Sequence, residues 1–184
     1  MKKEEEDFRL EPWIPVFEGK IPLKAHVHRA DDIQTAIRIS REFHLKCVII
    51  HGTEGYKIAD GLSYYNVPVI AGPILCDRCK PEMKDLDLKN AGILWKNGVK
   101  VALCTDHTVI PIQYLPLSAA LAVKGGMPYN AALRAITSDA AQILGIADRV
   151  GSIAVGLDAD LQLYSGDPLG LDDPCLVMVK GEII

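Results

Sequence analysis

The chain has 184 residues, a formal net charge of −4 at pH 7, 49% hydrophobic residues and 24% charged residues, which suits one domain with a substantial core. The negative charge and scattered basic residues argue against a nucleic-acid partner, and no apolar run approaches the ~20 residues of a membrane span. The highly charged residues 1–7 argue against a secretory signal, and five cysteines without framework spacing are typical of a reducing compartment, so we expect a cytoplasmic protein.

Short apolar strands alternate with helices along the first 144 residues. The strands are expected at residues 21–27, 47–50, 67–71 and 99–103, and the helices from residue 30 and at 54–65, 86–96, 115–124 and 129–144. Asp31 and Gln34 have the spacing of a capping box at the first of these helices. Gly98 stands where a helix C-cap glycine is expected. Buried-type strands that are each followed by a helix predict parallel βα units.

The rhythm of these units resembles that of a (β/α)8 barrel. The strands recur about 25 to 30 residues apart, with one shorter step of about 20, but there are four units and a whole barrel needs ~250 residues. The sequence therefore predicts an α/β fold with half of a TIM-like barrel, and a small open α/β sheet is the alternative. After Gly145 the segments 159–164 and 176–179 alternate apolar and polar residues, which predicts a small antiparallel element. We expect a barrel part at residues 1–144 and a β part at residues 145–184.

Three candidate metal ligands stand at predicted strand ends. His26 closes the first strand, His51 closes the second and Asp106 follows the fourth. In parallel barrels the catalytic groups come from the carboxyl ends of different strands, so these side chains are expected to converge. Two imidazoles and a carboxylate form a competent set of ligands for a divalent metal such as zinc. The carboxylate can also take a proton from water and return it to a leaving nitrogen.

Several sequence runs together resemble the amidohydrolase superfamily, most closely its imidazolonepropionase-related members. They are KAHVHRADDI at residues 24–33, IHGTE at 50–54, VALCTD at 101–106 and VGSIAVGLDADL at 150–161. The resemblance extends from about residue 21 to residue 184. It implies the C-terminal half of the family's barrel, with four strands equivalent to the fifth to the eighth, and a tail that contributes to a small β-sandwich.

The resemblance also implies a function and a site. It implies a metal-dependent hydrolase that cleaves C–N bonds of small-molecule amides, cyclic or linear. His26 and His51 would be metal ligands from the fifth and sixth strands, and Asp106 the ligand and general base of the eighth. Zinc is the expected metal, with manganese or iron as alternatives.

The sequence departs from the family pattern in its ligand set. The family places a His-x-His pair on its first strand and, in many members, a carboxylated lysine on its fourth, and nothing upstream of His26 matches either. The metal is therefore expected to be held weakly or lost. The pair His26-Val27-His28 falls where the family has one ligand. Because residues i and i+2 of a strand share a face, His28 remains a lesser candidate. His28 and His107 are expected to contact substrate.

Two hypotheses about the function follow from these observations. In the first, the chain is the C-terminal portion of a metal-dependent amidohydrolase. In the second, it is a non-catalytic, truncated remnant that self-associates through its open half barrel, because unpaired strand edges are usually avoided. We expect a homo-oligomer in either case. The Cys76-x-x-Cys79 spacing also occurs in metal and redox motifs, but without a second cysteine pair we assign it to a loop over the pocket mouth.

Overall fold

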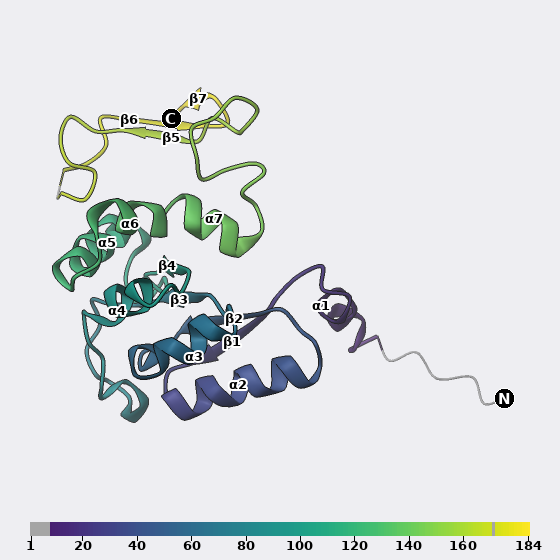
Figure 1. Ribbon diagram of the computed structural model, residues 1–184. Coiled ribbons are helices and arrows are strands. Elements are labelled where there is room, and N and C mark those ends of the chain that lie inside the picture. Colours follow the sequence, from purple (N-terminus) through teal and green to yellow (C-terminus); the bar gives the residue numbers. More distant parts are fainter. Residues whose placement is uncertain (1–7, 171) are drawn as a thin grey trace.

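The computed structural model describes residues 8–170 and 172–184, and its first layer is a parallel sheet flanked by helices (Figure 1). Four strands lie side by side in chain order: β1 (Leu23–Val27), β2 (Cys47–His51), β3 (Val69–Ala71) and β4 (Val101–Leu103). All three pairings are parallel. The predicted parallel βα units and the half-barrel order are therefore confirmed.

Helices follow each strand of this sheet. They are α2 (Ala30–Glu42), α3 (Ala59–Tyr64), α4 (Asn90–Lys96), α5 (Leu115–Lys124), α6 (Tyr129–Ala135) and α7 (Ser138–Leu144), with the short α1 (Ile14–Phe17) before β1. The 3-10 turns are η1 (Glu11–Trp13), η2 (Gly55–Ile58), η3 (Pro81–Met83) and η4 (Ile112–Tyr114). The helix predicted at 129–144 is two helices, because Thr137 has the non-helical angles φ −134° and ψ −101°.

Alternate residues of the strands point to opposite faces of the sheet. On the face toward the helices, Ile49 and Val69 are fully buried and pack with apolar residues of α2 to α6. On the other face, Val48 and Ala102 pack with Ile143 of α7. This second face, which would line the interior of a closed barrel, is exposed at His26 of β1.

The C-terminal segment forms a separate antiparallel sheet. Its strands are β5 (Leu161–Leu163), β6 (Leu176–Val179) and β7 (Glu182–Ile183), paired in that order. The two strands expected from period-two alternation are both present, shortened at β5, and β7 is an addition. Figure 1 shows this sheet beyond α6 and α7, away from β1 and β2. Within the described residues, no helix is long and apolar enough to cross a membrane.

Candidate metal centre

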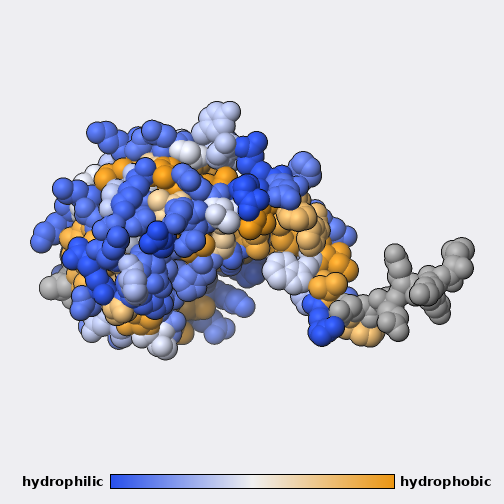
Figure 2. Space-filling model, turned by 90° about the horizontal axis from the view of Figure 1, so that it is seen from below, coloured by the Kyte–Doolittle hydropathy of each residue, from blue (hydrophilic) through white to orange (hydrophobic). Residues whose placement is uncertain are grey.

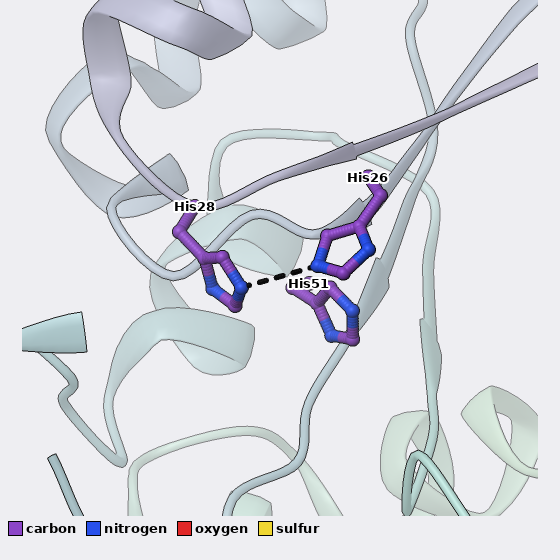
Figure 3. Close-up of side chains that lie close together, drawn as sticks. All are labelled: His26, His28 and His51. Carbon is purple, nitrogen blue, oxygen red and sulfur yellow. Dashed lines mark hydrogen bonds between the residues drawn. The ribbon is translucent and has the colours of Figure 1, made fainter. Parts of the chain in front are cut away.

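Three histidines meet at the carboxyl ends of β1 and β2 (Figure 3). The parallel register pairs His26 with Ile50 and Val27 with His51, so both strands end at the same edge of the sheet. His28 follows β1 directly. One ring nitrogen from each histidine belongs to a group whose atoms all lie within 4.8 Å of one another. The structure thus brings His26 and His51 together, and it adds His28 to them.

Hydrogen bonds at Nδ1 orient two of these rings. Nδ1 of His51 lies 2.6 Å from the carbonyl oxygen of Gly72. Because a carbonyl only accepts, this Nδ1 carries the proton and Nε2 keeps its lone pair. Nδ1 of His28 lies 2.8 Å from the hydroxyl of Thr53. Such partners on the other nitrogen are the usual support of metal-binding histidines.

The electrostatics favour neutral imidazoles. Burial, followed by the neighbouring His51 and His26, lowers the pKa of His28 from 6.5 to about 4. Burial also lowers the pKa of His51, against an opposing effect of its hydrogen bond to Gly72. A metal binds the neutral form of histidine, so both rings have a lone pair to offer at neutral pH. His26 is exposed and leaves one side of the group open to solvent.

Asp106 lies nearby but outside the histidine group. It follows β4 by three residues, is exposed, and has φ 53°. Its charge acts to raise the pKa of His51, so the two side chains are within electrostatic reach. Its neighbour His107 is also exposed. His51 shares the left-handed backbone conformation with φ 71°, a costly state for a residue other than glycine that recurs at functional sites.

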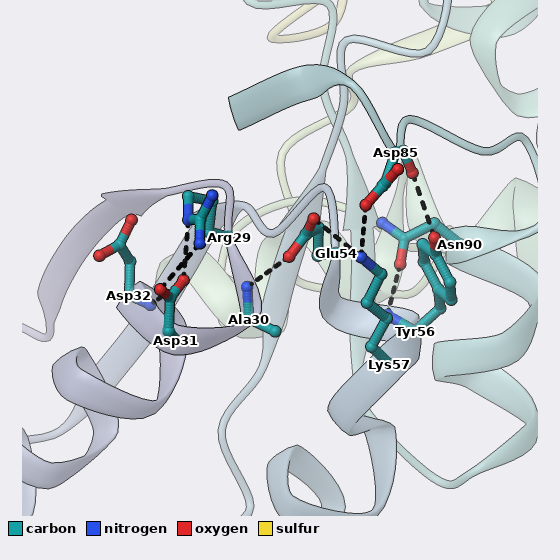
Figure 4. A network of polar contacts seen from close by, with 9 residues as sticks. All are labelled: Arg29, Ala30, Asp31, Asp32, Glu54, Tyr56, Lys57, Asp85 and Asn90. Atoms are coloured by element: carbon teal, nitrogen blue, oxygen red, sulfur yellow. Dashed lines mark hydrogen bonds and ion pairs between the residues drawn. The ribbon is translucent and has the colours of Figure 1, made fainter. Parts of the chain in front are cut away.

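A polar network fixes the loop that carries His51 and Thr53 (Figure 4). The buried carboxylate of Glu54 accepts from the backbone N–H of Ala30 at 2.9 Å and forms an ion pair with Lys57 at 2.8 Å. The expected capping box with Gln34 is wrong, because Arg29 is the N-cap of α2 without a side-chain cap; the carboxylate of Asp31 pairs with Arg29 and accepts from the first-turn N–H of Asp32 at 3.1 Å. Glu54, from the next βα unit, takes over the first amide of the helix.

The buried Asn90 ties the same loop to α4. Its amide donates to the carbonyl of Gly52 at 3.0 Å, and its oxygen accepts from the N–H of Tyr56 at 2.9 Å. One bond lies before Thr53 in the chain and the other after it, and Thr53 itself contacts His28. Glu54 stands at the start of the helix expected at 54–65, and no local pattern marks Asn90, because both side chains bind partners in other βα units.

The cysteine pair lies in the segment after β3. The thiol of Cys76 donates to the carbonyl of Pro73 at 3.2 Å, next to the carbonyl of Gly72 that holds His51. Cys79 is exposed, and neither cysteine belongs to the histidine group. Burial raises the pKa of Cys104 to about 11, which suits a small apolar side chain better than a ligand.

Comparisons with known proteins agree with this geometry. Residues 19–184 match the family described as the Amidohydrolase family. Amidohydrolase tasK of Hapsidospora irregularis is 27% identical over 197 residues, covering 96% of this chain and 18% of that protein. The imidazolonepropionase of Cupriavidus pinatubonensis is 35% identical over 85 residues, covering 45% of this chain and 20% of that protein.

Solved structures show the same fold. The crystal structure of an amidohydrolase from Thermotoga maritima MSB8 has a TM-score of 0.94 and 43% identity, covering 98% of this chain and 48% of that chain. The prolidase eah89906 complexed with N-methylphosphonate-L-proline has a TM-score of 0.70 at 18% identity, which shows the fold alone. This chain spans about half the length of these solved structures and about a fifth of the two curated relatives. The parallel half barrel and the family match over residues 19–184 together show that the chain belongs to the amidohydrolase family.

Proposed function

We propose that this chain supplies metal ligands and the general base of a metal-dependent amidohydrolase that hydrolyses a C–N bond of a non-peptide amide, cyclic or linear. The observation that carries the proposal is the meeting of His26 and His51 at the ends of neighbouring parallel strands in a chain of this family. With Asp106 they form the proposed ligand set. Zinc is the first choice of metal, and manganese or iron are the alternatives.

In this proposal some residues bind the metal and another transfers the proton. The two imidazoles hold the metal, which when bound activates water at neutral pH. The exposed carboxylate of Asp106, three residues beyond β4, takes the proton from the attacking water. It returns that proton to the leaving nitrogen. His28 and His107 are the proposed contacts to substrate.

The name of one relative supports a small cyclic substrate. Imidazolonepropionase is 35% identical to this chain over 85 residues. Because loops after the strands set specificity in such barrels, the segment between β3 and α4 is the part of this chain that would select among amides. We further propose that residues 1–144 form the barrel part and residues 145–184 contribute to a small β-sandwich. The five free cysteines are consistent with the proposed cytoplasmic location.

Asp106→Asn tests the proposed reaction. The zinc-loaded chain is assayed on a panel of cyclic and linear non-peptide amides. We expect the variant to hydrolyse them at least about 100-fold more slowly, because the asparagine side chain cannot accept the proton from water. Asparagine tolerates the positive φ of this position, so the fold should persist. Activity is measured as released amine or acid. Equal rates for the variant and the wild type would contradict the assignment of Asp106 as the base.

A second candidate function is a non-catalytic chain that self-associates. The sheet has open edges at β1 and β4, and large apolar side chains are exposed just before β1. Figure 2 shows apolar surface gathered where the N-terminal segment joins the body. These exposed residues are Phe8, Leu10, Trp13, Ile14, Phe17 and Ile21. Exposed apolar patches of this kind are typical of interaction surfaces.

Size-exclusion chromatography with light scattering tests self-association. We expect the mass of a dimer or larger oligomer, because pairing would cover the open edges and the apolar segment. Replacing Trp13 and Phe17 with aspartate should shift the chain toward the monomer. A monomer mass for the unsubstituted chain at high concentration would rule the proposal out.

A further inference from the structure

The His26-Val27-His28 pair has the spacing of two ligands on one metal. Nε2 of His26 lies 3.3 Å from Nε2 of His28. Two nitrogens bound to a tetrahedral zinc at about 2.0–2.1 Å lie about 3.3–3.4 Å apart. The two rings meet edge to face, with their Nε2 atoms at the separation that a shared metal would require.

His51 closes a third side of this pair. Its ring centroid lies 4.3 Å from that of His26, and it stacks on His28 at 4.8 Å with an interplanar angle of 6°. Since its Nδ1 donates to Gly72, the nitrogen left for a ligand role is Nε2. One ring nitrogen from each of the three histidines lies within 4.8 Å of the other two.

His28 is better placed than Asp106 to be the third ligand. It is 7% exposed, and Thr53 holds its Nδ1 at 2.8 Å while its Nε2 faces His26. Asp106 is exposed and lies outside the group. The carboxylate of Asp106 is therefore left for proton transfer and is not needed to complete the group of three imidazoles.

We propose that His26, His28 and His51 bind one divalent metal, with Zn²⁺ as the preferred ion, as a three-imidazole centre built entirely within this chain. The inference shares the assignment of His26 and His51 with the proposed function and replaces Asp106 by His28 as the third ligand. Three histidines are a sufficient protein ligand set for zinc and leave a fourth position open.

Titration of the metal-free chain with Zn²⁺ by calorimetry and with Co²⁺ by visible spectroscopy tests the proposal. We expect about one metal per chain and the intense visible bands of four-coordinate Co²⁺ for the wild type. His28→Asn should lower the affinity by at least about 100-fold and remove these bands, whereas His44→Asn, the same exchange at an exposed histidine outside the group, should leave the affinity within about threefold. Wild-type affinity in the His28→Asn variant would overturn the inference.

A second pair of variants separates ligand loss from misfolding. Thr53→Val removes the hydroxyl that orients His28 and should lower the affinity by about 10-fold, and Thr53→Ser should restore it. Circular dichroism of each metal-free variant checks the fold. Wild-type binding without hydrolysis of any amide would support the centre and count against the proposed function. A wild-type chain that takes up neither metal would overturn the centre.

Discussion

Gly72→Ala is expected to destabilise the protein by about 4 kcal/mol and to weaken metal binding with it. Gly72 has φ 137°, and a Cβ there would lie 2.1 Å from the carbonyl oxygen of Cys104. That oxygen belongs to the backbone after β4, so the chain itself must move. The carbonyl of Gly72 also holds Nδ1 of His51. Urea unfolding and Zn²⁺ titration measure the two effects.

Gly126→Ala is the matched control for this substitution. Gly126 also has a positive φ, 103°, but an added Cβ would meet nothing within 4 Å. It should therefore show only the backbone strain, about 1–2 kcal/mol, with unchanged metal affinity. Equal losses of stability for the two variants would show that the close contact of Gly72 with Cys104 contributes nothing.

His51→Asn is expected to reduce metal affinity by about 1,000-fold, because it removes one of three ligands. Asparagine tolerates the left-handed backbone that His51 adopts at φ 71°, so the end of β2 should keep its course. Metal content after equilibrium dialysis, measured by atomic emission, gives the result. Retained occupancy in this variant would remove His51 from the set of ligands.

His44→Asn provides the corresponding control. His44 is exposed, lies at the end of α2, and also has a positive φ, 55°. The exchange therefore repeats the same change of side chain in the same backbone conformation, away from the centre. We expect full metal occupancy, and a loss equal to that of His51→Asn would indicate a non-specific effect.

Much of the fold follows from local patterns in the sequence. Runs such as Cys47–His51 are apolar on both faces, as strands covered by helices must be, and each is followed by a helical segment. Gly98 was expected at a helix end and has φ 81° beyond α4. Element ends were less predictable: the N–H of Tyr56 in η2 is bound by Asn90 of another βα unit, and the break at Thr137 appears only in its backbone angles.

The sequence predicted where the candidate site lies better than it predicted which residues form it. Because His26 and His51 stand at strand ends, parallel pairing predicts that both lie at the same edge of the sheet. His28 was ranked below Asp106 by the family resemblance, although the i and i+2 rule already placed it on the same face as His26. What the sequence does not show is Thr53, 25 residues away, which orients His28. Such support appears only when two βα units pack together.

The most direct test of the metal centre is the zinc content of this chain alone after equilibrium dialysis against buffered Zn²⁺. Three imidazoles within 4.8 Å, with two of them held by outer hydrogen bonds, predict about one zinc per chain. The His26→Asn/His51→Asn double variant should bind none under the same conditions. A wild-type content below about one tenth of an equivalent would contradict a metal centre at these strand ends.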